Sequence, residues 1–384
     1  MMDKKTSGGQ KTASPTRRRR VWWIIGIVCT ILAIGLGGAS WYMLDYALCP
    51  DRPTSYDLPR QLARTVQENP QIKPWIDSLQ QHHALRDTFV TMPTGERHHA
   101  VYVRAPHAKG RVAVLVHGYT DNCMSMIHIA SIYGRQGYHL LLPDLHGHGR
   151  SEGKAIQMGW KDRLDVLHWT QVAQHMFADP EAETQMVLHG VSMGAATVMS
   201  LSGEKLPTYI KCFVEDCGYT SVWDEFSNEL AQSFHLPPFP LMYTTSVLCQ
   251  LRYGWRFGEA SPLHQVAKCR LPMLFIHGDK DTYVPFAMLQ PLYEAKPQPK
   301  EMWVVPGSVH AFSDTATTEI FACQDTLPLP DARPPSPSGG GVSRAPFQGA
   351  PRSGGGCNET QFYRPMDIIA NLLQPPASLR SAAP

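Results

Sequence analysis

The longest apolar stretch of the chain lies close to its N-terminus. Residues 21–44 read VWWIIGIVCTILAIGLGGASWYML and contain no charged side chain. At a rise of about 1.5 Å per residue this stretch forms a helix about 36 Å long, enough to cross a hydrocarbon layer of about 30 Å. Tryptophan and tyrosine at both ends suit the two membrane interfaces. The pattern predicts a transmembrane helix over residues 21–44.

Basic residues precede this apolar stretch. Residues 1–20 contain three lysines and four arginines but one acid, Asp3. Because positive charge is retained on the cytoplasmic side, we expect a single-pass membrane protein with a cytoplasmic N-terminus and an extracytoplasmic catalytic domain. Cleavage of a signal peptide among the small residues 37–40 is the alternative. The apolar stretch exceeds the usual length of a signal-peptide core, which favours an uncleaved anchor.

Beyond the anchor, short apolar runs alternate with helix-like stretches. Residues 45–85 contain several prolines and form a connector, with helices predicted over residues 58–68 and 75–86. Continuous apolar runs then indicate strands that are covered on both faces. The predicted strands are residues 100–103, 112–116, 138–142, 186–188, 210–214, 273–276 and 302–305. This alternation predicts an α/β domain over residues 86–327, with a mostly parallel central sheet and helices on both faces.

Two segments depart from this alternation. Residues 217–268 are aromatic and helix-prone, with a proline-rich break at 237–240. We expect them to form a small helical cap over a site, because ligand pockets are apolar and lie between substructures; extra helices packed on the sheet are the alternative. Proline and glycine supply 14 of the 29 residues from 328 to 356. Residues 328–384 are therefore predicted to form a disordered tail, and the change in composition also suits a spliced or frame-shifted end.

Composition narrows the classes of function. The formal net charge is +2 over 384 residues, and the clearest basic cluster is at positions 17–20, so a broad nucleic-acid-binding surface is not indicated. The nine cysteines show no C-x-x-C pair and no metal-ligand spacing. In an oxidising compartment some cysteines could pair, for instance Cys212 with Cys217 or Cys249 with Cys269, but spacing fixes no connectivity. We expect neither a metal nor a cofactor.

One serine stands where a strand-like run meets a helix-like run. Residues 186–199 read MVLHGVSMGAATVM, with Ser192 at the centre of a G-x-S-x-G pattern. A strand that turns sharply into a helix forces its apex residue into strained dihedral angles, and only glycines fit on either side. The Ser192 hydroxyl is then held at a helix N-terminus, where N–H groups favour developing negative charge. The pattern suits a nucleophile, although it also arises by chance in ordinary turns.

Two later strand ends supply partners for this serine, which needs a base and an orienting acid. Residues 274–285 read LFIHGDKDTYVP and place Asp281 in a turn, and residues 303–313 read WVVPGSVHAFS and place His310 in a loop. We predict Asp281 as the acid and His310 as the base. Other candidates for these roles stand at neighbouring strand ends. Asp216 and Asp279 are alternative acids, and His277 and His117 are interpreted as packed or hydrogen-bonded histidines.

The G-x-S-x-G turn between strand and helix and the order Ser192, Asp281, His310 resemble the α/β-hydrolase fold family. Within it, the likeness is to single-domain serine hydrolases of the esterase, lipase and serine-aminopeptidase-like group, and it covers about residues 86–325. The motifs that carry it are a G-x-x-D-x-x-V-P turn and a G-x-x-H loop, matched by Gly278, Asp281, Val284 and Pro285 and by Gly307 and His310.

The resemblance also implies the roles of two other segments. It implies an oxyanion hole formed by the backbone N–H groups of Tyr119 and Met193. The run DLHGHGRS at 144–151 matches a D-x-x-G-x-G-x-S glycine loop of the family. Its alternating histidines, His146 and His148, would need further converging ligands to hold a metal, so we interpret the run as that loop.

These residues predict a membrane-anchored serine hydrolase of the carboxylesterase class that forms an acyl-enzyme on Ser192. The expected substrate is a small-molecule ester or amide, and an aromatic cap favours an apolar acyl group. An aminopeptidase-like amidase or an acyltransferase would use the same residues. The alternative from another class is a non-catalytic membrane-anchored binding protein with this fold.

Overall fold

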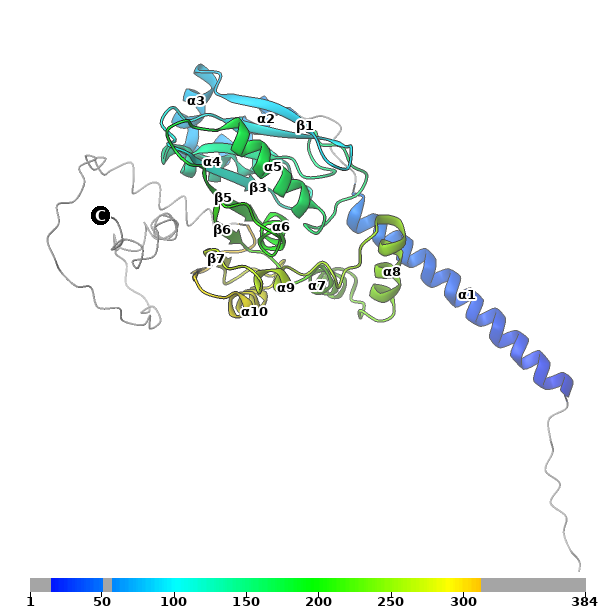
Figure 1. Ribbon diagram of the computed structural model, residues 1–384. Coiled ribbons are helices and arrows are strands. Elements are labelled where there is room, and N and C mark those ends of the chain that lie inside the picture. Colours follow the sequence, from blue (N-terminus) through cyan, green and yellow to red (C-terminus); the bar gives the residue numbers. More distant parts are fainter. Residues whose placement is uncertain (1–14, 51–56, 312–384) are drawn as a thin grey trace, which may run out of the picture.

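The computed structural model describes residues 15–50 and 57–311 (Figure 1). The predicted tail over residues 328–384 and most of the basic leader fall outside these ranges. Within them, a central sheet is flanked by helices, and one long helix projects away from the domain.

The sheet contains eight strands among the described residues, in the order β1-β2-β4-β3-β5-β6-β7-β8. Strand β2 pairs antiparallel with both β1 and β4, and all other neighbours are parallel. The strands are β1 (Leu85–Thr91), β2 (Arg97–Val103), β3 (Arg111–Val116), β4 (His139–Pro143), β5 (Gln185–Val191), β6 (Ile210–Asp216), β7 (Met273–Gly278) and β8 (Lys300–Val305). The prediction of a mostly parallel α/β sheet is confirmed.

Helices cover both faces of this sheet, which explains the continuous apolar runs. In β3, Val112 and Val114 contribute to one core cluster, and Ala113 and Leu115 contribute to the other, because alternate side chains point to opposite faces. One face is covered by α2 (Leu58–Glu68), α3 (Lys73–Gln81) and α4 (Ile127–Arg135). The other is covered by α5 (Asp162–Met176), α6 (Met193–Ser202) and α10 (Leu289–Ala295), and short 3-10 helices lie at Pro70–Ile72, Cys123–Met126 and Phe286–Met288.

The predicted helix over residues 75–86 is wrong at its C-terminal end. Helix α3 ends at Gln81, His83 adopts a left-handed backbone conformation with a φ of +47°, and β1 begins at Leu85. Strand β1 lies at the sheet edge, and its residues are exposed or half-buried. It therefore lacks the continuous apolar run by which the inner strands were predicted.

Helix α1 (Pro15–Leu48) is longer at both ends than the predicted 21–44. Residues Arg19–Leu48 are long and apolar enough to cross a membrane, and the most apolar part of this stretch is not buried by the domain. The last turns do pack on the domain, because Leu44 and Leu48 are fully buried in its core. The helix continues past Asp45, whose carboxylate pairs with Arg252 at 2.7 Å.

Residues 217–268 form three helices between β6 and β7. They are α7 (Val222–Phe234), α8 (Leu241–Tyr253) and α9 (Pro262–Val266). The predicted proline-rich break at 237–240 separates α7 from α8. Helix α8 lies beside the end of α1 (Figure 1), and the Ser40 and Thr244 hydroxyls are hydrogen-bonded at 2.6 Å across this contact.

The loop after β4 is held by one fully buried carboxylate, that of Asp144. Its Oδ1 accepts from the N–H of Cys123 at 2.7 Å, and its Oδ2 accepts from the N–H of Arg150 at 2.9 Å and from His99 Nδ1 at 2.7 Å. Burial raises the pKa of Asp144, but the hydrogen bond from His99 and the nearby histidines outweigh this, so the pKa lies below its usual value. These bonds fix the glycine loop of residues 144–151.

We expect Asp144→Ala to lower the free energy of unfolding by about 3 kcal/mol or more, because it leaves several buried donors without an acceptor. Urea unfolding of the detergent-solubilised protein, followed by tryptophan fluorescence, measures this loss. The folded-state pKa lies below the unfolded value of about 3.9, so the contribution is present above about pH 4 and lost as the pH falls through the folded pKa.

A matched control is Asp77→Ala, which removes an exposed carboxylate that pairs with Lys73. Exposed pairs contribute about 0–1 kcal/mol, so this variant should unfold close to the wild-type midpoint. Equal losses for both variants would contradict the role of Asp144.

Candidate active site

Ser192 occupies a sharp turn between β5 and α6. Its φ of +57° and ψ of −120° lie outside the regions that L-residues favour. A Cβ added at Gly190 would lie 2.1 Å from the carbonyl oxygen of Gly194, and one added at Gly194 would lie 2.0 Å from that of Val116. Both positions therefore require glycine, which explains the G-x-S-x-G pattern.

His310 and Asp281 lie beside this serine. The Ser192 Oγ is 2.9 Å from His310 Nε2, and His310 Nδ1 is 2.7 Å from Asp281 Oδ2. Strands β7 and β8 run parallel with Gly278 opposite Val305, so the loops that follow them start side by side and bring the acid to the histidine. The structure thus gathers the three residues of the predicted triad into one hydrogen-bonded chain.

The Asp281 carboxylate is fixed from several directions. Its Oδ1 accepts from the N–H groups of Tyr283 and Val284, both at 3.0 Å, and the Oδ2 that contacts His310 also lies 3.3 Å from His277 Nε2. Burial raises the pKa of Asp281, but the hydrogen bonds from His277 and His310 outweigh it and the pKa lies below its usual value. The ionised form is therefore favoured.

His277 is a buried neighbour whose contact with Asp281 the sequence did not reveal. Its Nε2 donates to the carbonyl oxygen of Val284 at 3.0 Å. Burial lowers the pKa of His277, but the hydrogen bond to Asp281 and the nearby Glu215 raise it, and the pKa lies above its usual value. The spacing of four residues between His277 and Asp281 was the available signal.

The other candidate residues take different positions. Asp279 Oδ1 accepts from the N–H of Gly307 at 2.7 Å and so shapes the turn. The alternative acid Asp216 lies at the end of β6 and lines a cavity with Ser192. The carboxylate that is hydrogen-bonded to His310 is that of Asp281, the predicted acid. His117 Nε2 accepts from the N–H of Leu145 at 3.0 Å, which agrees with its interpretation as a hydrogen-bonded histidine.

The predicted oxyanion donors lie on either side of the serine. Met193 begins α6, and the register of β3 against β5, Val116 opposite Gly190, brings the loop with Tyr119 next to the turn. Among the described residues, neither the Tyr119 nor the Met193 N–H donates to a backbone carbonyl. The Tyr119 hydroxyl donates to the carbonyl oxygen of Ala47 in α1, at 2.7 Å.

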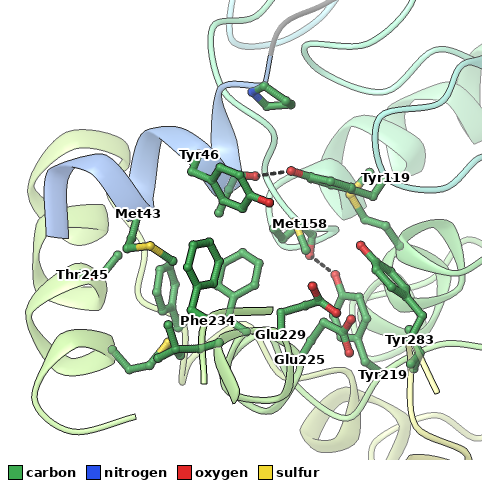
Figure 2. Close-up of a pocket in the computed structure, with 18 of the residues that line it drawn as sticks. Met43, Tyr46, Tyr119, Met158, Tyr219, Glu225, Glu229, Phe234, Thr245 and Tyr283 are labelled. Carbon is green, nitrogen blue, oxygen red and sulfur yellow. Dashed lines mark hydrogen bonds between the residues drawn. The ribbon is translucent and has the colours of Figure 1, made fainter. Parts of the chain in front are cut away.

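A mostly apolar cavity of about 300 Å³ has Ser192 in its lining. Figure 2 shows this cavity with ten of its other lining residues labelled. Its walls come from α1, from α7 and α8, and from the loop that carries Tyr119. The cap predicted over residues 217–268 thus contributes to the walls. Apolar side chains from three helices define the cavity: Met43, Tyr46, Phe226, Leu230, Phe234 and Met242. A second cavity of about 520 Å³ contains Ser192 and His310 together with Asp216.

Two carboxyl groups from α7, Glu225 and Glu229, line the apolar cavity (Figure 2). Glu225 is only 3% exposed, and its Oε2 has no hydrogen-bond partner among the described residues. Burial, followed by the charge of Glu229, raises the pKa of Glu225 well above its usual value. The neutral acid is therefore favoured, and no motif in the sequence marks this residue.

Three groups of metal-type side chains converge in the described ranges, with ligand atoms within 4.8 Å of one another. One contains Asp281 and His310 of the triad together with Cys217, and a second contains Asp144, whose oxygens already accept hydrogen bonds. The third, formed by Glu96, His98 and His146, lines neither cavity at the serine. All seven cysteines of the described part are free thiols, including both pairs considered from sequence.

Part of the chain is similar in sequence to a known family and to bacterial proteins. Residues 106–231 match the family described as "Serine aminopeptidase, S33"; this range contains Ser192 but ends before Asp281 and His310. The uncharacterized protein YqkD of Bacillus subtilis (strain 168) is 28% identical over 220 residues, 57% of this chain and 71% of the relative. The uncharacterized protein YfhR of Escherichia coli (strain K12) is 24% identical over 213 residues, which are 54% of this chain and 66% of the relative.

A solved structure shows the same fold over most of the chain. The Pyrococcus furiosus esterase Pf2001 aligns with a TM-score of 0.53 at 19% identity, covering 73% of this chain and 95% of the esterase. The strand order, the turn at Ser192 and these similarities agree with one another. The chain therefore has the α/β-hydrolase fold, and its residues 106–231 are similar to the serine aminopeptidase S33 family.

Proposed function

We propose that the protein is a membrane-anchored serine hydrolase that cleaves carboxylic esters through an acyl-enzyme on Ser192. The observation that carries this proposal is the hydrogen-bonded chain from Ser192 through His310 to Asp281, placed beside an apolar cavity. A nucleophile, a base and an orienting acid at these distances are the requirements of acyl transfer.

The reaction follows from the atoms in this chain. His310 Nε2 takes the proton of Ser192 Oγ as that oxygen attacks the ester carbonyl carbon, and the resulting oxyanion accepts hydrogen bonds from the Tyr119 and Met193 N–H groups. When the tetrahedral intermediate collapses, its bond to the alcohol oxygen breaks, and the leaving alcohol receives the proton from His310. Water then attacks the acyl-enzyme with His310 as base, and the carboxylic acid leaves with Ser192 restored. Asp281 holds the imidazole and stabilises its charged form.

The cavity supports an apolar acyl group as the substrate portion bound next to Ser192. Its walls are mainly aromatic and aliphatic, and the raised pKa of Glu225 favours an uncharged acid there. A second candidate, cleavage of an aminoacyl amide, is favoured by the pair Glu225 and Glu229, because a protonated amine bound beside them would favour the ionised form of Glu225 and pair with it. Transfer of the acyl group to an acceptor other than water would use the same steps.

Replacing the nucleophile separates an enzyme from an inert binding protein. We expect Ser192→Ala to abolish labelling by a fluorophosphonate probe and to lower hydrolysis of p-nitrophenyl butyrate by about 10⁴-fold or more, because no oxygen remains to form the acyl-enzyme. Ser202→Ala, in the same helix but outside both cavities, serves as the matched control and should keep labelling. Failure of the native protein to label would favour the binding protein.

The contact between His277 and Asp281 predicts a positioning role. We expect His277→Ala to lower kcat for the same ester by about tenfold with little change in KM, because the acid is then less firmly oriented towards His310. His277→Gln keeps an N–H donor for the Val284 carbonyl and should recover part of kcat. Steady-state kinetics measures both, and a change confined to KM would contradict this role.

Glu225→Gln distinguishes the two candidate substrates. For ester cleavage we expect turnover of p-nitrophenyl butyrate within about threefold of wild type, because a neutral amide replaces a neutral acid. The variant should also become more stable than wild type as the pH rises above about 4.3. Above this pH Glu225 ionises in the unfolded wild-type chain but stays protonated in the folded one, which lowers the free energy of unfolding of wild type alone. Exclusive turnover of aminoacyl anilides, lost in this variant, would instead support the amidase.

A further inference from the structure

We propose that the end of α1 and the adjoining cap rest on the bilayer surface, and that the substrate is an amphiphilic lipid ester whose acyl chain enters the cavity from the membrane. This inference rests on the proposed ester cleavage at Ser192. Three observations support it: residues of α1 form part of the cavity wall, an exposed apolar patch lies on the cap beside α1, and a row of aromatic rings connects the apolar span to the cavity.

The anchor helix is itself a wall of the cavity. Met43, Tyr46 and Ala47 of α1 line the cavity beside Ser192. Figure 2 shows Met43 and Tyr46 at this wall. The interface-type residues Trp41 and Tyr42 precede them directly and are exposed. At about 1.5 Å per residue, the first of these wall residues stands only about 3 Å along the helix axis from Trp41. The cavity therefore begins at the level where the apolar helix leaves the bilayer.

The anchor is held firmly against the cap. Arg252 of α8 pairs with Asp45 at 2.7 Å, and its guanidinium lies over the ring of Trp41, 4.1 Å from the centroid. With the hydrogen bond between Ser40 and Thr244, these contacts join α1 to α8 along successive turns. The cavity wall is consequently fixed in position along the axis of α1, at a constant distance from the apolar span. A flexible tether would leave this distance free to vary.

The cap carries an apolar patch next to this junction. Tyr243, Val247 and Leu251 follow one another at a spacing of four along α8 and so share one side of the helix. Phe239 continues the row, with its ring centroid 5.9 Å from that of Tyr243. We call this set, with Leu236, the cap patch; the exposed fractions of Leu236, Phe239, Tyr243, Val247 and Leu251 are 44%, 72%, 55%, 47% and 78%.

The bilayer is the occupant that fits the cap patch. The patch lies on a helix packed against α1, and the exposed surface of α1 is itself apolar along the predicted span. An apolar surface continuous with a membrane span dips into the headgroup region, where Tyr, Phe and Leu side chains are favoured. A patch of this kind in water would be costly and prone to association.

A row of aromatic rings connects the span to the cavity. The Tyr42 and Tyr46 rings stack with centroids 6.3 Å apart, and Tyr46 meets Phe234 edge to face at 5.4 Å. Tyr46 and Phe234 both line the cavity. An acyl chain that leaves the bilayer along these rings stays in contact with apolar surface until its ester reaches Ser192.

The test uses the full chain reconstituted in phosphatidylcholine vesicles with two esters of one fluorophore, 4-methylumbelliferyl oleate in the bilayer and 4-methylumbelliferyl acetate in the water. We expect the double variant Val247→Glu, Leu251→Glu to lower oleate turnover about fivefold and to leave acetate turnover unchanged, because charge lifts the patch from the interface. Leu164→Glu, at an exposed leucine of α5, is the matched control and should change neither.

A second variant tests the wall formed by α1. Ala47→Trp fills the cavity from the anchor and should reduce oleate turnover more than acetate turnover, whereas Ala39→Trp, on the exposed side of the same helix, should reduce neither. Equal effects on both esters, or none from the patch variant, would overturn entry from the membrane while ester cleavage stands. If neither ester is cleaved and Ser192 takes no fluorophosphonate label, the proposed function fails as well.

Discussion

The close approach of α6 to the sheet is the constraint on which the active site depends. The backbone of Gly194 passes the carbonyl of Val116 so closely that no side chain fits, and the same turn forces Ser192 to a positive φ. Buried helix α6 and strands β3 and β5 hold this strained turn in place. The hydroxyl, the helix N-terminus and the loop with Tyr119 meet at one point because of this packing.

The second requirement is a carboxylate that stays ionised although it is buried. Asp281 meets it by accepting hydrogen bonds from two backbone N–H groups and by contacting two imidazoles. The two histidines that contact Asp281 have different roles. His310 reaches Ser192, whereas His277 lies fully buried behind the acid and can only steady it. Orientation of the base is thus achieved by a network rather than by one pair.

Local signals were sufficient for the features that depend on local burial. The inner strands were predictable because both of their faces are covered, and the turn at Ser192 because its glycines have no substitute. Strand β1 was missed because an exposed edge strand needs no apolar run, and its pairing with β2 defines it instead. The contact between Ser40 and Thr244 joins residues 204 positions apart, so no local pattern could place α1 in the cavity wall.

That placement changes what the anchor does. A helix that only tethers a domain needs no specific contacts with it, yet α1 buries Leu44 and Leu48 in the core and accepts a hydrogen bond from Tyr119 through Ala47. The hydroxyl that makes this bond belongs to a residue whose N–H stands beside the nucleophile. Displacement of α1 would therefore disturb both the cavity wall and the loop that carries Tyr119. Helix α1 and the α/β domain form one structural unit, so in the proposed membrane anchoring the position of α1 in the bilayer sets the position of the site.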